Sequence, residues 1–318
     1  GKYEVKMKLK DEGKYLIFVQ FNEIDLPSSP FEIQVSLKLK PRNYKEINRP
    51  KLTFGSFGSE NGQLNYPYGM TIDSKGNILI CDSFNNRIQI FDSNGKFIST
   101  FGSEGNGNGQ FLFPVGITIS SKGNIIVSDY DNHRIQIFDS NGKFISTYGS
   151  EGNGNGQLNG PEQICVDLND NIYVCDYGNN RIQMFDSEGK FISAFGKQGN
   201  GNGQFNGPCG IAINSKGNII VSEYSNHRIQ IFNSEGNFIL KFGSNGNGNG
   251  QFDNPLRISV DFNDNIFVCD SDNNRVQIFN SNGEYISQLE VNAPLYVAID
   301  QNTQEIIVCG NDNRISIF

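Results

Sequence analysis

The residues that could bind a metal or carry out covalent chemistry are few, and most of them recur at fixed intervals. The chain has six cysteines and two histidines. Because there is no CxxC pair, and because cysteine alternates with serine at one repeat position, we expect free, buried thiols in a reducing compartment. The residues at that position are Cys81, Ser128, Cys175, Ser222, Cys269 and Cys309.

The two histidines, His133 and His227, occupy the same repeat position two repeats apart. A three-histidine zinc site therefore cannot be assembled. No motif places a cysteine or serine nucleophile beside a histidine. The sequence predicts no catalytic residue, no metal and no cofactor, so this chain is not expected to be an enzyme.

Two loop patterns imitate ligand-binding motifs. The segment Asp167-x-Asn169-x-Asn171 begins like a calcium loop, but Ile172 stands where such a loop needs glycine, and Gly178 stands where it needs glutamate. The Gly-Asn-Gly-Asn-Gly segments lack the lysine and the following helix of a phosphate-binding loop. We expect a hairpin turn for the first pattern and loops between repeat units for the second.

One arginine recurs in every repeat unit, and in five units an acidic residue precedes it by five positions. We expect these pairs to be structural and to lie across a short hairpin, which leaves little cationic charge for a polyanion. The pairs are Asp82–Arg87, Asp129–Arg134, Asp176–Arg181, Glu223–Arg228 and Asp270–Arg275, and the sixth arginine is Arg314.

Composition indicates a folded chain that is dense in turns. Of the 318 residues, 36% are hydrophobic and 36 residues are glycine, which suits tight turns and disfavours long helices. Residues 1–50 carry ten basic and seven acidic groups, so residues 51–318 hold the remaining 16 basic and 27 acidic groups, a net charge of −11. Such a surface repels nucleic acid at long range. No transmembrane span or signal peptide is expected, and residues 1–10 have the pattern of a mid-domain strand, so the natural N-terminus is expected upstream.

A repeat of 47 residues determines the predicted architecture. Prolines recur at positions 67, 114, 161, 208 and 255, and a sixth unit begins at Pro294. Each full unit holds four short apolar runs separated by turn residues, such as residues 116–119, 125–127, 134–138 and 144–148. Four strands per repeat of this length predict an all-β fold, a six-bladed β-propeller with four-stranded antiparallel blades.

The sixth unit supplies only three strands before the chain ends at Phe318. Residues 51–54 have the pattern of an outer strand with no unit of their own. We therefore expect this N-terminal strand to complete blade six and to remove an open sheet edge. The predicted domains are residues 1–40, a linker at 41–50, and the propeller at 51–318.

The segments Asp129-Tyr-Asp-Asn-His-Arg-Ile-Gln-Ile-Phe138 and Glu223-Tyr-Ser-Asn-His-Arg-Ile-Gln-Ile-Phe232 resemble the NHL repeat, and the resemblance covers residues 51–318. Three units have asparagine in place of histidine, and the sixth unit departs further. Residues 13–19 and 26–35 resemble the last strands of a filamin-type immunoglobulin-like domain. Together the two parts resemble the C-terminal half of tripartite-motif NHL proteins, in which an upstream RING finger and B-box provide ubiquitin-ligase activity.

Residues that break the repeat are the predicted binding site, because near-identical blades leave specificity to the exceptions. Aromatic residues in the loop between second and third strands should surround a shallow central depression on the face that also bears the interblade loops. Four further exceptions come directly after the prolines that open the blades. The predicted site is Phe84, Tyr130, Tyr177 and Tyr224, together with Glu162, Gln163, Arg257 and Tyr296. The alternative for the tyrosines is packing between adjacent loops.

The function predicted from these observations is non-enzymatic recognition of a protein or peptide partner, as the substrate-recognition part of a larger cytoplasmic ubiquitin-ligase-type protein. Single-stranded RNA binding by the same face is the alternative, which the resemblance implies for some relatives. A purely structural or sensor propeller is a third possibility. No membrane partner and no small-molecule substrate are expected.

Overall fold

The computed structural model describes residues 3–4, 17–19, 35–37, 42–47 and 49–318. The chain divides into two compact units, Gly1–Asn43 and Tyr44–Phe318. In the first unit, β1 (Tyr3–Glu4), β2 (Ile17–Val19) and β3 (Val35–Leu37) form an antiparallel sheet in the order β1-β2-β3. Most of the filamin-like segment lies outside the described residues, so that resemblance stays a prediction.

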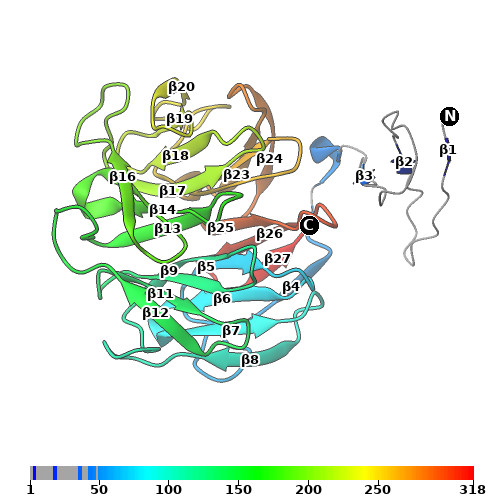
Figure 1. The fold of residues 1–318 in the computed structure, drawn as a ribbon. Coiled ribbons are helices and arrows are strands. Elements are labelled where there is room, and N and C mark those ends of the chain that lie inside the picture. The colour runs from blue at the N-terminus through cyan, green and yellow to red at the C-terminus, as the bar shows by residue number, and fades with distance from the viewer. Residues whose placement is uncertain (1–2, 5–16, 20–34, 38–41, 48) are drawn as a thin grey trace, which may run out of the picture. The chain divides into compact units, whose positions relative to one another are not determined.

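The second unit is a six-bladed β-propeller in which every blade is a four-stranded antiparallel sheet, as predicted (Figure 1). The innermost strands each begin at one of the repeating prolines. They are β5 (Pro67–Ile72), β9 (Pro114–Ile119), β13 (Pro161–Val166), β17 (Pro208–Ile213), β21 (Pro255–Val260) and β25 (Pro294–Ile299). The second strands are β6 (Ile78–Asp82), β10 (Ile125–Asp129), β14 (Ile172–Asp176), β18 (Ile219–Glu223), β22 (Ile266–Asp270) and β26 (Ile306–Gly310).

The two outer strands of each blade complete the sheet. The third strands are β7 (Arg87–Phe91), β11 (Arg134–Phe138), β15 (Arg181–Phe185), β19 (Arg228–Phe232), β23 (Arg275–Phe279) and β27 (Ile315–Ile317). The outermost strands are β8 (Phe97–Phe101), β12 (Phe144–Tyr148), β16 (Phe191–Phe195), β20 (Phe238–Phe242), β24 (Tyr285–Glu290) and β4 (Leu52–Phe54). Four short 3-10 turns are η1 (Tyr44–Glu46), η2 (Ser83–Asn85), η3 (Tyr177–Asn179) and η4 (Ser271–Asn273).

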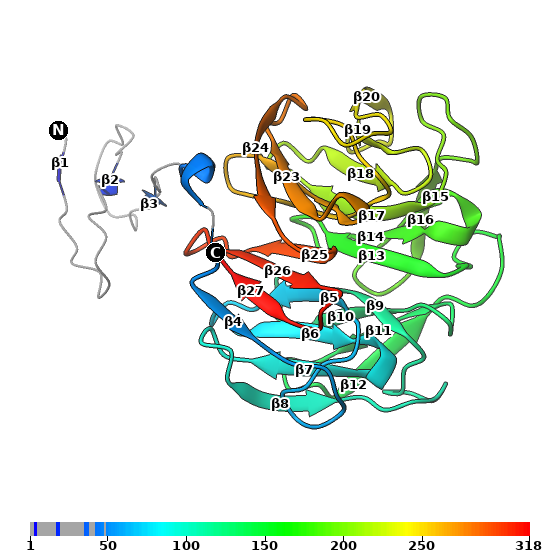
Figure 2. The ribbon, with the colours of Figure 1, turned by 180° about the vertical axis from the view of Figure 1, so that it is seen from behind.

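The N-terminal strand of the propeller closes blade six, which confirms the predicted closure. Strand β4 pairs antiparallel with β27, with Leu52 opposite Ile317 and Phe54 opposite Ile315. Figure 2 shows these two strands, from opposite ends of the propeller sequence, side by side. The ring of blades is therefore held shut by backbone hydrogen bonds rather than by side-chain packing alone.

The core lies between the blades, which explains why both faces of the second strands are apolar. In β6, Ile78 and Ile80 pack in the cluster shared with blade six, whereas Leu79 and Cys81 pack in the cluster shared with blade two. A strand covered on both faces has no solvent side, so the alternation of polar and apolar residues is lost.

The polar turns between strands are fixed by short side chains. In blade two, the Oδ1 atom of Asp139 accepts hydrogen bonds from the backbone N–H groups of Asn141 and Lys143, and Gly142 has a φ of +79°. The Asn141-Gly142 turn is therefore capped by an aspartate. The segment Asp167–Asn171 is also such a turn, as predicted, because Oδ1 of Asp167 accepts the N–H groups of Asn169 and Asn171.

The second unit begins at Tyr44, inside the segment 41–50 that the sequence assigns to a linker. Tyr44 is buried, its ring meets Phe267 edge-on at 5.2 Å, and its hydroxyl donates to Oδ2 of Asp261 at 2.5 Å. Tyr44 belongs to the apolar cluster between blades five and six. No helix among the described residues has the length and apolar character needed to cross a membrane.

Candidate functional site: the crown face and the plugged channel

One face of the propeller carries two sets of loops, and we call it the crown. The first set joins second to third strands within each blade, and the second set joins one blade to the next. Across residues 55–66, 83–86, 102–113, 130–133, 149–160, 177–180, 196–207, 224–227, 243–254, 271–274, 291–293 and 311–314, these loops hold seven acidic residues and two basic ones. The acids are Glu60, Glu104, Asp131, Glu151, Asp253, Asp272 and Asp312, and the bases are Lys197 and Arg314.

The predicted acid–arginine pairs are confirmed in all five blades, with distances of 2.5 to 2.8 Å. In blade two, buried Asp129 accepts the N–H of Leu112 and hydrogen bonds from Asn132, Arg134 and Gln136. Arg134 also donates to three loop carbonyls. Each pair therefore fastens an interblade loop to its blade, and these guanidinium groups are already occupied by protein acceptors.

The histidines have a structural task that asparagine shares. His133 has a φ of +53°, and its Nδ1 atom accepts the N–H of Gly160 at 3.0 Å. In blade one, Asn86 has a φ of +52° and its Oδ1 atom accepts the N–H of Phe113 at 2.8 Å. Both side chains place an acceptor under the loop that leads to the next blade, so the exchange of histidine for asparagine preserves the hydrogen bond.

A continuous patch of aromatic rings lies on the crown over blades one and two. We call it the aromatic arc, and it consists of Tyr66, Tyr68, Phe84, Phe113 and Tyr130. Successive ring centroids are 4.9 to 6.3 Å apart. Phe84 is 54% exposed, and neighbouring Leu112 is 37% exposed.

Sequence reasoning found Phe84 and Tyr130 but missed the other arc residues. The signal was present in the pair that precedes each proline: it is Asn-Tyr before Pro67 and Leu-Phe before Pro114, against Asn-Gly before Pro161 and Pro208. Tyr66 and Phe113 have φ values of +52° and +59°. Bulky residues rarely adopt this conformation, which costs on the order of 1 kcal/mol or more.

The remaining predicted tyrosines, Tyr177 and Tyr224, lie on the same face over blades three and four and are half-buried. A Cβ atom at Gly160 would lie 2.8 Å from the ring of Tyr130, and one at Gly207 would lie 3.0 Å from the ring of Tyr177. The rings of Tyr130 and Tyr177 therefore pack directly against the glycine of the following loop. These tyrosine rings pack between adjacent loops and are also partly exposed on the crown.

Three of the predicted site residues lie inside the channel instead of on the surface. Gln163, Arg257 and Tyr296 are 3%, 1% and 6% exposed. The other three blades have glycine at this position. A side chain does not fit there, because a Cβ atom at Gly69 would lie 1.9 Å, and one at Gly116 2.5 Å, from a carbonyl oxygen of the next blade. A partner on the outer surface of the crown would not reach these side chains.

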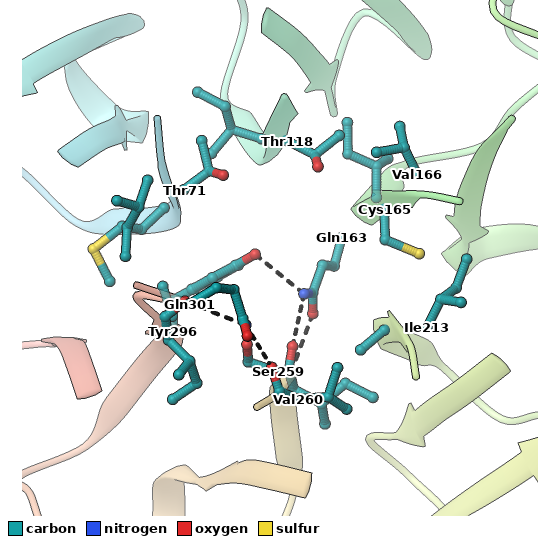
Figure 3. Close-up of a pocket in the computed structure, with 18 of the residues that line it drawn as sticks. Thr71, Thr118, Gln163, Cys165, Val166, Ile213, Ser259, Val260, Tyr296 and Gln301 are labelled. Atoms are coloured by element: carbon teal, nitrogen blue, oxygen red, sulfur yellow. Dashed lines mark hydrogen bonds between the residues drawn. The ribbon is translucent and has the colours of Figure 1, made fainter. Parts of the chain in front are cut away.

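Gln163 joins four blades across the axis of the propeller (Figure 3). Its Nε2 atom donates to the carbonyl of Ile258 and to the hydroxyl of Tyr296, and its Oε1 atom accepts the N–H groups of Ile211 and Ile258. All hydrogen-bonding positions of the amide are filled. Gln163 and Tyr296 therefore form a plug that closes the channel, and we use this name for the pair below.

Arg257 and Glu162 form a buried ion pair between the innermost strands of blades five and three. The Arg257 guanidinium also lies 5.3 Å from the ring centre of Tyr68, while its Nε atom has no hydrogen-bond partner among the described residues. Burial raises the pKa of Glu162, and Arg257 opposes that shift. The ion pair thus packs beneath the aromatic arc, where Arg257 contacts the ring of Tyr68.

The cysteine thiols are not activated as nucleophiles or metal ligands. All six cysteines are free, and burial raises the pKa of each thiol, which makes the thiolate rare. No three histidine, cysteine, aspartate or glutamate side chains of the described chain come together as a metal site would require. The crown is suited to contact by shape, aromatic surface and charge.

The sequence of the propeller matches a known repeat family. The NHL repeat matches residues 64–91, 111–138, 158–185, 205–232 and 252–279. The E3 ubiquitin-protein ligase TRIM71 of Rattus norvegicus is 37% identical over 97 residues, which cover 30% of this chain and 11% of that protein. Protein lin-41 of Caenorhabditis elegans is 38% identical over 90 residues, which cover 28% of this chain and 8% of that protein. The matched region thus spans about a tenth of the length of these curated relatives.

Solved structures share the fold at low sequence identity. A streptogramin B lyase superimposes with a TM-score of 0.60 and 18% identity, covering 84% of this chain and 85% of the lyase. A gluconolactonase from Xanthomonas campestris superimposes with a TM-score of 0.63 and 14% identity, covering 81% of this chain and 87% of that enzyme. At this identity the likeness concerns the propeller fold alone.

Proposed function

Because this chain carries five NHL repeats in a six-bladed propeller, we propose that it is a non-enzymatic recognition module that binds a protein partner on the crown. We further propose that it acts as the substrate-recognition part of a larger ubiquitin-ligase-like protein. The second proposal rests on the similarity to part of TRIM71 and lin-41.

The aromatic arc is the observation that carries the first proposal. Aromatic side chains are the usual anchors of protein interfaces, because they bury much area at low entropic cost. The arc combines exposed Phe84 with two aromatic residues that are held at positive φ against their preference. Backbone strain of this kind gathers at functional sites. Tyr177 and Tyr224 extend the proposed contact surface toward blades three and four.

The charge of the crown defines the partner more closely. Seven acidic residues and two basic ones lie on its loops, and the five strand arginines are paired with buried acids. A partner with apolar side chains flanked by lysine or arginine would be attracted, whereas a polyanion would be repelled. We therefore favour a basic protein segment over single-stranded RNA.

The test compares two double variants of the 318-residue chain. Phe84→Ser with Leu112→Ser removes two exposed apolar side chains of the crown, one in the aromatic arc and one beside it. Ile98→Ser with Ile145→Ser removes two isoleucines that are each 50% exposed on outermost strands, away from the crown. Both pairs lie at exposed positions, so both variants should keep the wild-type melting temperature.

Proteins retained by the immobilised chain are identified by mass spectrometry, and each is then purified and titrated. We expect the Phe84→Ser, Leu112→Ser protein, the crown variant, to bind a true partner at least tenfold more weakly than wild type. The Ile98→Ser, Ile145→Ser protein should keep the wild-type affinity. A partner that binds both variants equally would refute the crown as the binding site. A parallel titration with random single-stranded RNA at two salt concentrations tests the alternative, because tight RNA binding that is lost only in the crown variant would reverse the preference.

The ligase context requires a separate experiment. The gene sequence upstream of residue 1 is read for the cysteine–histidine pattern of a RING finger or B-box. The full-length protein is then assayed for ubiquitin transfer to the identified partner. Transfer that continues undiminished in the crown double variant would contradict the substrate-recognition role.

A further inference from the structure

A cavity of about 450 Å³ lies below the plug, on the face opposite the crown. It is lined by the innermost strands of all six blades and by the hairpins at the ends of those strands in blades one and six. The crown end of the channel is closed by Gln163 and Tyr296, so this cavity opens only toward the opposite face. It is therefore separate from the proposed partner surface.

Successive rings of side chains line the cavity because equivalent residues of the repeat converge at the axis. Immediately below the plug is a ring of small residues, several of which are visible in Figure 3. The ring consists of Thr71, Thr118, Cys165, Ala212, Ser259 and Ala298. Aliphatic side chains such as Ile72, Val260 and Ile299 line the wall below it. The interior is thus mainly apolar, with a few hydroxyl groups.

The mouth of the cavity carries negative charge. Asp73 and Asp300, from neighbouring blades one and six, line it, and none of the lining residues is lysine or arginine. Arg257 is not among the residues that line the cavity, and it is paired with Glu162. Both aspartates begin a hairpin turn and cap its backbone N–H groups through Oδ1.

Asp300 differs from its counterparts because one of its carboxylate oxygens accepts no hydrogen bond from the described residues. In blades one, three and five, Oδ2 of the equivalent aspartate accepts a hydrogen bond from an asparagine four residues later. The hairpin of blade six is one residue longer, and its last residue, Glu305, pairs with Lys51 instead. Asp300 is 8% exposed, and no residue of the described chain donates to its Oδ2 atom. A largely buried carboxylate that lines the cavity, and to whose second oxygen the described chain gives no donor, can accept a cationic or hydrogen-bonding ligand there.

We propose that this cavity binds a small organic cation, a primary ammonium group carried on an apolar body. The ammonium group lies between Asp300 and Asp73 at the mouth, and the apolar body lies against the aliphatic wall. This proposal goes beyond the partner-binding function and departs from the expectation that the chain takes no small molecule. A lysine side chain of a partner protein would enter with its ammonium group first and carry the charge past the carboxylates, so it fits less well.

The probe is n-hexylamine, with 1-hexanol as its uncharged match. Binding to the 318-residue chain is followed by the methyl NMR signals of Ala212 and Ala298 in the cavity, with exposed Ala194 on an outermost strand as the reference. We expect saturable shifts of the two cavity methyl groups and not of Ala194. Hexylamine should bind at least about tenfold more tightly than hexanol, because a hydrogen-bonded ion pair stabilises only the charged ligand.

Asp300→Asn is the decisive variant, since it removes the charge and keeps the turn. Asn214 occupies the same repeat position in blade four and caps its hairpin through Oδ1 in the same way. The matched control is Asp92→Asn, which removes one charge from a capped hairpin outside the cavity, at a position where blade four has Asn233.

We expect Asp300→Asn to weaken hexylamine binding by about tenfold, Asp73→Asn to weaken it less, and Asp92→Asn to leave it within twofold. A lysine-containing tripeptide should shift the cavity methyl groups more weakly than hexylamine does. The proposal is overturned if the cavity methyl groups do not respond to hexylamine. Equal loss of affinity in Asp300→Asn and Asp92→Asn, or tighter binding of the lysine peptide, also overturns it.

Discussion

Tyr44 should account for a measurable part of the stability of the closed propeller. In the interfaces that precede the other blades, the hairpin between third and fourth strands covers an outer-strand aromatic residue of the preceding blade. Gly142 lies against Phe101 in this way, with a Cβ position 2.5 Å from its ring. Blade six has no such hairpin, since its third strand β27 ends the chain and its fourth strand β4 comes from the other end of the propeller. Tyr44 packs into that interface in its place.

The magnitude can be worked out from the contacts of Tyr44. Truncation of a buried aromatic side chain to alanine costs about 3 to 5 kcal/mol. Tyr44→Phe should cost less, about 1 kcal/mol, because Asp261 keeps hydrogen bonds from Asn263 and Asn265 when the hydroxyl is lost. In a unit of this size 1 kcal/mol corresponds to about 2 to 4 °C, so Tyr44→Ala should lower the melting temperature by roughly 6 °C or more.

Urea and thermal unfolding of the two Tyr44 variants measure these costs. The control is Phe57→Ala, which removes an aromatic ring that is 68% exposed and should change stability by less than about 0.5 kcal/mol. Deletion of residues 1–40 should leave the melting temperature of the propeller unchanged, whereas deletion of residues 1–50 should lower it. If Tyr44→Ala matches the Phe57→Ala control, the segment does not hold the blade interface and the reasoning fails.

Four other outcomes are expected. Tyr148→Phe should stabilise the chain by about 1 kcal/mol in urea unfolding, because the buried hydroxyl has no partner in the part of the chain that the structure describes and four of the other five blades have phenylalanine there; a loss of stability would point to an unseen partner. Asp176→Asn should cost about 3 kcal/mol by leaving a buried guanidinium uncompensated, while Asp176→Glu should cost less, because Glu223 forms the same pair in blade four. His133→Asn should be tolerated and His133→Leu should lower the melting temperature, since only the former keeps an acceptor for the next blade; equal melting temperatures would contradict that role. A disulfide reagent at neutral pH should modify none of the five buried thiols, Cys81, Cys175, Cys209, Cys269 and Cys309, until the chain is unfolded, and rapid labelling of these residues in the native protein would contradict their burial and raised pKa values.

Much of the fold was accessible from the sequence because it is encoded locally. Each blade is a short stretch whose prolines, turn glycines and apolar runs repeat every 47 residues. Blade number, strand order and the acid–arginine pairs can be deduced from that period. The closing strand can be deduced by counting, because the last unit lacks one strand and residues 51–54 supply it.

The position of the exceptions was decided only by the tertiary structure. Glu162, Gln163, Arg257 and Tyr296 stand out as breaks in the repeat, but nothing in the repeat says whether such a residue faces a partner or the axis. Gln163 meets Tyr296 because two innermost strands, 133 residues apart in the sequence, point at one axis. Contacts across the axis depend on the size and polarity of residues in other blades, and a local pattern contains no information about them.

The same physical limit applies to Tyr44 and Asp300. Tyr44 lies in a segment without periodicity, and its burial depends on a gap that exists only in blade six. Asp300 has the same sequence role as Asp73, yet within the described part of the chain its second carboxylate oxygen lacks a donor, because the hairpin of blade six contains one extra residue. The repeat therefore specifies the blades, whereas the way the ring closes and the side chains that meet at its axis are properties of the assembled propeller.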